Sequence, residues 1–260
     1  MAAHSTPVST FMSSPVRSVA EGAPLAEAYA VLCDRSLSCL AVEDSHHRPV
    51  GVISRTDLLR IGRLREARGR RMPLLEFPAQ TVSEVMHRGV ISVLPDAPVS
   101  EAAGRMVRDH IHRVFVGTEK RLEGVFSTKD VMRAIEVSRI ARPISDFMST
   151  PVLTVSVLET IATATDRLTS ANVAGLVVVD QDEKPVGVFT QLEALQARTL
   201  SAATPVEDAM SYAMLCLDVH TPLHRAAAYA VDTRVRRVIA VEHRRVWGLL
   251  TGIDFARAVI

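Results

Sequence analysis

The heptapeptide Gly124-Val125-Phe126-Ser127-Thr128-Lys129-Asp130 has the pattern glycine, two apolar residues, a hydroxyl, two variable positions and a carboxylate. Three further copies of this pattern run from Gly51 to Asp57, from Gly187 to Glu193 and from Gly248 to Asp254. Apolar residues before the hydroxyl indicate a buried strand, and the spacing Ser/Thr-x-x-Asp/Glu is typical of a helix start. Each copy therefore predicts a junction between a strand and a helix.

A methionine precedes each of these glycines, at Met12, Met86, Met148 and Met210, by 39, 38, 39 and 38 residues in turn. A short β-like stretch, an Ala-rich helical pattern and a buried-type strand lie between each methionine and its glycine. Because the distances alternate, the first and third units share one loop length and the second and fourth share another. The spacing predicts β-α-β-β-α units arranged as a pair that has been duplicated once.

We expect the four repeats to occupy residues 8–60, 81–136, 143–198 and 205–260. Residues 61–80 form a longer basic linker. Leu58, Ile61 and Leu64 are spaced three apart across its start, and we therefore expect the preceding helix to run on into it. A unit of about 54 residues buries too little surface to be secure alone. Pairing of neighbouring repeats is therefore expected.

Four copies in register at matched spacing resemble the CBS domain, the regulatory module named for cystathionine β-synthase. This resemblance implies an α/β (α+β) fold of four repeats in two tandem pairs, each pair joining two three-stranded sheets with helices on their outer faces. It further implies that adenine ribonucleotides (AMP, ADP or ATP) bind between paired repeats. In the family, two pairs often assemble into a disc, which here requires no dimer, although the pattern leaves a homodimer open.

The resemblance also assigns roles to residues of the repeated pattern. The carboxylate implies a ribose contact and the hydroxyl a phosphate contact, which gives Asp57 with Ser54, Asp130 with Ser127, Glu193 with Thr190, and Asp254 with Thr251. Arg113 and Arg237, at the start of the preceding strand, are then the phosphate cations, whereas the first and third repeats have Cys39 and Gly175 there. The second and fourth sites are therefore expected to be the best equipped, and the longer Glu193 side chain to give the weakest site.

A second interpretation needs no ligand, because Ser/Thr-x-x-Asp/Glu is also a capping box that satisfies free N–H groups at a helix start for about 0.5–2 kcal/mol. We expect the repeated methionines to fill cores rather than contact ligands. We also expect the three cysteines, Cys33, Cys39 and Cys216, to be buried reduced thiols, since they form no C-x-x-C motif.

Composition excludes several classes of protein. The 260 residues include 30 Lys+Arg and 29 Asp+Glu for a net charge of +1, so coating nucleic acid or an anionic membrane is not expected to be the main activity. No apolar run is long enough to span a bilayer, and Met1 to Ser5 lack a signal-peptide pattern, which predicts a cytoplasmic protein. No nucleotide-loop, metalloprotease or nucleophile-elbow motif occurs, and the nine histidines suggest no metal site.

The predicted function is therefore non-catalytic sensing, with an adenine nucleotide as regulatory ligand, no required cofactor, and an unidentified effector protein as partner. Three alternatives remain open. The module could bind another adenosyl ligand, such as S-adenosylmethionine or NAD, or it could be a structural or interaction protein that uses the junctions only as caps. It could also bind nucleic acid through a basic run, Arg60, Arg63, Arg65, Arg68, Arg70 and Arg71, with strong salt dependence.

Overall fold

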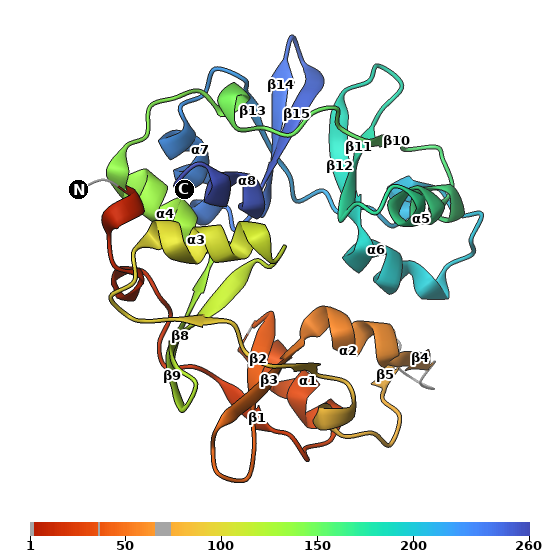
Figure 1. Ribbon diagram of the computed structural model, residues 1–260. Helices are drawn as coiled ribbons and strands as arrows, with labels where there is room; N and C mark the ends of the chain where they lie inside the picture. Colours follow the sequence, from red (N-terminus) through yellow and green to blue (C-terminus); the bar gives the residue numbers. More distant parts are fainter. Residues whose placement is uncertain (1–2, 36, 66–73) are drawn as a thin grey trace. The chain divides into compact units, whose positions relative to one another are not determined.

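The structure is a computed structural model that describes residues 3–35, 37–65 and 74–260 (Figure 1). The chain divides into two compact units. The first comprises Met1–Met12, Asp96–Arg113 and Phe126–Ile260, and the second comprises Ser13–Pro95 and Val114–Val125. The division runs through the second repeat, which shows that the compact units differ from the sequence repeats.

All four repeats have the predicted element order β-α-β-β-α. Repeat 1 contains β1 (Ser18–Ala20), α1 (Leu25–Asp34), β2 (Cys39–Glu43), β3 (Pro49–Ser54) and α2 (Arg55–Ile61). Repeat 2 contains β7 (Ser92–Val93), α3 (Val99–Arg108), β8 (Arg113–Thr118), β9 (Arg121–Ser127) and α4 (Thr128–Ser138). Repeat 3 contains β10 (Thr154–Ser156), α5 (Ile161–Ser170), β11 (Gly175–Val179), β12 (Pro185–Thr190) and α6 (Gln191–Gln196). Repeat 4 contains β13 (Leu215–Asp218), α7 (Leu223–Asp232), β14 (Arg237–Glu242), β15 (Arg245–Thr251) and α8 (Gly252–Arg257).

Each repeat builds a mixed sheet with its middle strand at the centre. In repeat 4, β13 pairs with β14 in parallel, and β14 pairs with β15 antiparallel with Arg237 opposite Thr251. A parallel first pair requires a crossover, and the helix between the two strands supplies it. Repeat 1 differs from the predicted three strands, because β6 (His87–Arg88) from the start of repeat 2 adds to β3 and makes a four-stranded sheet.

Repeats exchange their opening segments, the short 3₁₀ turns that precede the repeated methionines: η2 (Val8–Thr10), η3 (Val82–Glu84), η4 (Ile144–Asp146) and η6 (Val206–Asp208). Val82 and Met86 of repeat 2 lie in the hydrophobic core of repeat 1, and Val206 and Met210 of repeat 4 lie in that of repeat 3. The Val206 N–H donates to the Glu159 carbonyl at 2.8 Å. A repeat without its neighbour therefore lacks part of its core, which explains why the repeats occur in pairs.

The repeated methionines pack on the repeated glycines of the paired repeat. A Cβ at Gly248 would lie 2.2 Å from the Met148 sulfur, and a Cβ at Gly187 would lie 2.6 Å from the Met210 sulfur. Met86 is 8% exposed and Met210 is 9% exposed, so the prediction that these methionines fill cores is confirmed for both. Glycine is favoured at these two positions because a Cβ there would occupy the volume of the methionine thioether.

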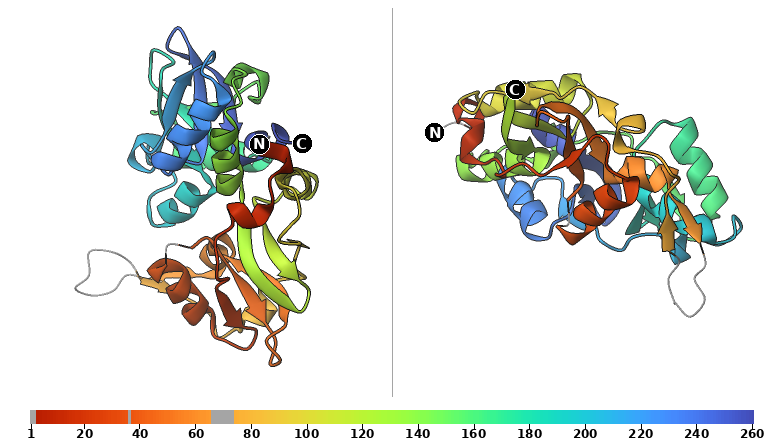
Figure 2. Two further views of the ribbon diagram at one scale, coloured as in Figure 1. Left: turned by 90° about the vertical axis from the view of Figure 1, so that its left-hand side faces the viewer. Right: turned by 90° about the horizontal axis from the view of Figure 1, so that it is seen from below.

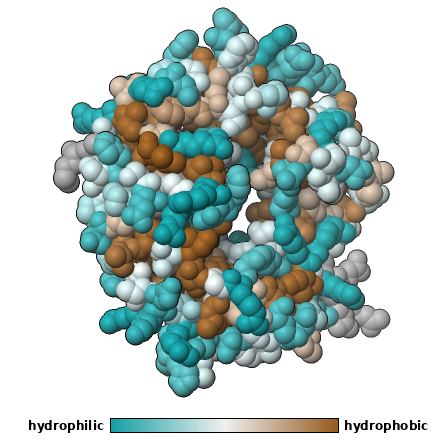
Figure 3. Space-filling model, in the orientation of Figure 1, coloured by the Kyte–Doolittle hydropathy of each residue, from teal (hydrophilic) through white to brown (hydrophobic). Residues whose placement is uncertain are grey.

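In the first unit, the helices of repeats 2 and 4 form one cluster in which α4 packs on both α7 and α8, and α3 packs on α8 (Figures 1 and 2). Met106, Ile135 and Phe255 are fully buried. Figure 3 shows a mixed surface over α3 and α4, with apolar side chains beside polar ones. The helix starts also meet, since a Cβ at Gly252 of α8 would lie 2.5 Å from the Thr128 hydroxyl of α4.

The prediction that a helix extends into the linker is wrong. The helix expected to run into residues 61–80 ends at Ile61, because Gly62 adopts an extended conformation, and the chain continues as a hairpin of β4 (Arg63–Arg65) and β5 (Leu74–Glu76). Glycine is a weak helix former, and pairing of Arg63 with Glu76 gives the backbone an alternative partner. Arg68, Arg70 and Arg71 of the basic run lie outside the described residues.

The cysteines are not buried as expected. Cys33 and Cys216 are exposed and Cys39 is half-buried. In β2 the side chains of Leu40 and Val42 point into the core of repeat 1. Because strand side chains alternate between faces, Cys39 points away from that core.

Candidate functional site

The four predicted junctions all have the same cap geometry. In each, the backbone N–H of the hydroxyl residue donates to the carboxylate three positions later, at 3.0 Å for Ser54–Asp57, 2.8 Å for Ser127–Asp130, 3.0 Å for Thr190–Glu193 and 2.7 Å for Thr251–Asp254. The hydroxyl donates to the same oxygen in every junction. The predicted capping boxes are therefore present at all four junctions, and both the ligand-binding role and a role as caps alone stay predictions.

The cap occupies only one carboxylate oxygen, and the other oxygen of Asp57, Asp130 and Asp254 contacts a further side chain. Asp130 Oδ1 accepts from Arg133 at 3.1 Å, and Asp254 Oδ1 accepts from Arg257 at 3.0 Å. Asp254 Oδ1 also accepts from the hydroxyl of Ser149 in the paired repeat at 3.0 Å. These two carboxylates are therefore fully engaged by neighbouring side chains.

Junction 1 is more accessible than junctions 2 and 4. The Asp57 side chain is 14% exposed, against 3% for Asp130 and 2% for Asp254. Its Oδ1 lies 3.3 Å from Nε2 of His87, which comes from the paired repeat and is 76% exposed. His87 takes the position after the methionine that Ser149 takes in the other pair. A ligand could therefore approach Asp57 by displacing one surface side chain.

Burial controls the electrostatics of junction 2. Burial raises the pKa of the Asp130 carboxyl, while hydrogen bonds from Ser127 and the charges of Arg133 and Lys129 oppose that rise. A buried carboxylate is costly unless hydrogen bonds and a countercharge satisfy it. Ser127 and Arg133 together supply these partners to Asp130.

Arg237 reaches the third junction, although the sequence assigned it to the fourth. Its backbone lies opposite Thr251, as expected, but its guanidinium donates to the Ala174 carbonyl at 3.2 Å. A Cβ at Gly175 would lie 3.4 Å from the Arg237 Nε, so the missing side chain makes room for it. Burial lowers the pKa of Arg237, and the nearby Glu193 carboxylate opposes this. The weakest predicted ribose site is therefore the one next to this arginine.

A cationic cluster lies where repeats 2 and 4 meet. It consists of His112, Arg113, Arg236 and Arg237, from the first residues of β8 and β14 and the residue before each. Burial lowers the pKa of His112, and the charges of the three arginines lower it further. The Thr128 N–H at the start of α4 donates to the His112 carbonyl at 3.0 Å, which ties the cluster to junction 2. Such a concentration of positive charge attracts anions.

Sequence reasoning missed five side chains of this region: Arg133, Arg257, His87, Ser149 and His112. The two arginines had a local signal, because each follows its carboxylate by three residues on a helix. His87 and Ser149 each follow a repeated methionine. Their reach to the carboxylate of the paired repeat depends on the exchanged opening segments, which a single repeat does not reveal.

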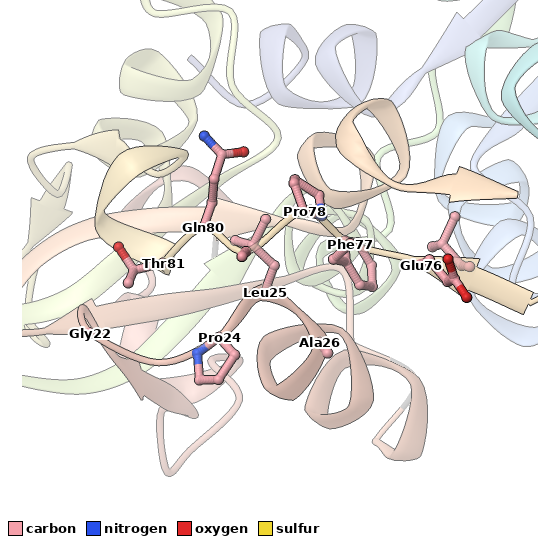
Figure 4. Close-up of a pocket in the computed structure, with 11 residues that line it drawn as sticks. Gly22, Pro24, Leu25, Ala26, Glu76, Phe77, Pro78, Gln80 and Thr81 are labelled. Atoms are coloured by element: carbon pink, nitrogen blue, oxygen red, sulfur yellow. The ribbon is translucent and has the colours of Figure 1, made fainter.

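A pocket of about 540 Å³ lies in the second unit, between the start of α1 and the segment that follows β5 (Figure 4). Leu25, Phe77 and Pro78 supply apolar lining, and Glu76 and Gln80 supply polar groups. The lining contains none of the predicted site residues. This pocket is therefore separate from the junctions.

Within residues 3–35, 37–65 and 74–260, no three His, Cys, Asp or Glu side chains gather closely enough to ligate a metal ion. Over the same part of the chain, every helix is too short or too polar to cross a bilayer.

Comparison with known proteins places these features in context. A family model for the CBS domain matches residues 8–63, 82–137 and 144–199. The matched ranges cover the first three repeats, and the fourth is identified by its identical element order in the structure.

Two curated relatives match about half of the chain. The chain is 31% identical over 121 residues to 5'-AMP-activated protein kinase subunit gamma-3 of Sus scrofa, covering 46% of this chain and 23% of that protein. It is 28% identical over 131 residues to homoserine O-acetyltransferase of Methanococcoides burtonii, covering 50% of this chain and 24% of the relative. The chain thus spans about a quarter of the length of each.

Solved structures with the same fold include some that cover nearly the whole chain. Protein MJ1225 of Methanocaldococcus jannaschii, a proposed archaeal homologue of g-AMPK, superimposes with a TM-score of 0.76 at 17% identity, over 98% of this chain and 100% of that one. This similarity shows that the two proteins share a fold.

Proposed function

Because the chain belongs to the CBS-domain family, we propose that it is a non-catalytic regulatory protein that binds an adenine ribonucleotide between its repeats. The nucleotide would lie with its ribose at a junction carboxylate and its phosphates toward the cationic cluster. Binding would then change the relative stability of two conformations, and an effector protein would respond to the change.

The observation that carries this proposal is the cationic cluster of His112, Arg113, Arg236 and Arg237. Its members come from two repeats, and the pKa of His112 is lowered first by burial and then by the charges of Arg113, Arg236 and Arg237. The three arginines are well suited to phosphate oxygens, because each guanidinium offers several N–H donors and a positive charge, and the His112 ring can add one N–H donor. The positive charge of this cluster favours the phosphate-bearing ligands AMP, ADP, ATP and NAD over S-adenosylmethionine, which is itself a cation.

The junctions supply a complementary group for the sugar. A carboxylate oxygen accepts hydrogen bonds, and the 2′ and 3′ hydroxyls of a ribose are neighbouring donors. Junction 2 is tied to the cluster through the Thr128–His112 backbone bond, which brings its carboxylate and the cations into one region. The similarity to a subunit of a 5'-AMP-activated kinase supports an adenine nucleotide as the ligand.

Calorimetric titration of the full chain with AMP, ADP, ATP, NAD and S-adenosylmethionine tests the proposal. We expect at least one phosphate-bearing ligand to bind, and Arg113→Gln and Arg237→Gln each to weaken it. The loss of one charge-assisted hydrogen bond, about 1.5–3 kcal/mol, corresponds to roughly 10- to 150-fold in Kd.

Arg225→Gln is the matched control, because Arg225 is an exposed arginine on α7. It should leave binding unchanged. The proposal fails if none of the five ligands binds to folded protein, or if binding is the same in the cluster variants as in Arg225→Gln. Tighter binding of S-adenosylmethionine than of any phosphate-bearing ligand would also contradict it.

A further inference from the structure

We propose that Arg133, and in the same way Arg257, is a latch that closes its junction by occupying the carboxylate oxygen a ribose needs. This inference rests on the proposed function and concerns how the same sites are regulated. The two arginines act through the carboxylates, by donating to the oxygen at which the ribose would bind.

The two oxygens of each carboxylate have separate tasks. Oδ2 of Asp130 accepts from both the backbone N–H and the hydroxyl of Ser127, at 2.8 and 2.7 Å. These contacts hold the start of α4, so a ligand that took this oxygen would uncap the helix. Oδ1 accepts from Arg133 at 3.1 Å. A ribose hydroxyl can therefore reach the carboxylate without loss of the cap only at Oδ1, where Arg133 already lies.

Burial makes the competition strict. The Asp130 side chain is 3% exposed, so its surface offers almost no room for a further donor while Arg133 is in place. Arg133 itself is 41% exposed and Arg257 is 53% exposed. A partly exposed guanidinium can move into water without disturbing the core. The latch is therefore reversible, and a ligand opens it by supplying donors of its own.

The latch has a local origin. Side chains three positions apart on a helix are neighbours, so Arg133 stays beside Asp130 whenever α4 is formed. At the fourth junction Arg257 donates to Asp254 Oδ1 in the same way, and the Ser149 hydroxyl donates to that oxygen as well. At the third junction the corresponding position is Gln196, which has no positive charge. Glutamine at this position is therefore compatible with a capped helix, which makes Arg133→Gln a suitable variant for the test.

Titration with adenosine, which has a ribose but no phosphate, separates the latch from the phosphate site. We expect Arg133→Gln to bind adenosine about 3- to 10-fold more tightly than the wild type, since one charge-assisted hydrogen bond no longer competes. Arg133→Lys keeps a cation beside Asp130 and should bind nearly as the wild type does. Lys129→Gln is the matched control, because Lys129 contributes charge but no hydrogen bond to Asp130.

The gain should require the freed oxygen. In an Asp130→Asn background, which has one oxygen instead of two, Arg133→Gln should no longer increase adenosine affinity. Equal or weaker adenosine binding by folded Arg133→Gln overturns the latch, as does an equal gain in Lys129→Gln. A loss of AMP affinity with no change for adenosine also overturns it, and would make Arg133 a phosphate contact.

Failure of the latch can be told from failure of the proposed function. If the wild type binds AMP but Arg133→Gln shows no gain for adenosine, only the latch is wrong. If neither protein binds adenosine or any nucleotide, both proposals are wrong.

Discussion

Replacement of Gly248 by alanine tests the packing that joins repeats 3 and 4. A Cβ at this position would lie 2.2 Å from Sδ, 2.6 Å from Cγ and 3.0 Å from Cβ of Met148. Ordinary carbon contacts are about 3.5–4.0 Å, so Met148 would have to move by more than an ångström. Rotation about its side-chain bonds can relieve the sulfur contact, but its Cβ is fixed to the backbone.

We estimate the cost from two opposing effects. Overpacking of a close contact costs about 1–3 kcal/mol. Alanine in place of glycine inside a strand recovers about 0.5–1 kcal/mol, because it loses less backbone freedom on folding. Because the 2.2 Å contact is far inside the van der Waals distance, the overpacking cost belongs in the upper half of its range, and Gly248→Ala should lower the free energy of unfolding by about 1–2.5 kcal/mol.

Urea unfolding followed by tryptophan fluorescence measures this effect, because the one tryptophan of the chain, Trp247, precedes Gly248 in β15. Gly104→Ala is the control, since a Cβ there meets no atom within 4 Å and the residue lies inside α3. It should stabilise the protein by about 0.5–1 kcal/mol. In a Met148→Ala background, which removes the sulfur and Cγ contacts but keeps the Cβ, Gly248→Ala should cost clearly less than it does in the wild type. An unchanged cost in that background, or a Gly248→Ala variant as stable as the wild type, would refute the reasoning.

Three further predictions concern other parts of the fold. Val206→Ala should destabilise the protein by about 2 kcal/mol in urea unfolding, because this side chain of repeat 4 is fully buried in the core of repeat 3. A cost below about 0.5 kcal/mol would contradict the exchange of opening segments. The pKa of Glu159 is lowered, first by the Ser156 N–H and then by Arg167, so the stability that this carboxylate contributes should be lost as the pH falls below the ordinary value of 4.5. In Glu159→Gln the free energy of unfolding should therefore depend less on pH in this range, and a pH profile identical to that of the wild type would contradict this. Burial and neighbouring arginines lower the pKa of His112, so the free energy of unfolding should decrease as the pH falls below 6.5. His112→Gln should remove this part of the decrease. A steeper loss of stability at low pH in the variant would show that the pKa of His112 is raised and not lowered.

Local patterns predicted most of the fold. The order β-α-β-β-α, the duplicated pair and the four strand-to-helix junctions follow from the spacing of Gly51, Gly124, Gly187 and Gly248 and their methionines. The capping boxes were predictable for the same reason, because each joins residues three positions apart. The longer linker was recognised, but Gly62 and the β4–β5 pairing turned the expected helix extension into a hairpin.

The sequence by itself determined which hydroxyls and carboxylates cap each helix. Only the tertiary structure decided that the second oxygens of Asp57 and Asp254 contact His87 and Ser149 of the paired repeat. It also decided that the Arg237 guanidinium lies beside Gly175 of another repeat. A cap is made by neighbours in the chain and can be read from spacing. These other contacts join residues from 30 to 105 positions apart, and they arise because paired repeats exchange segments and pack together.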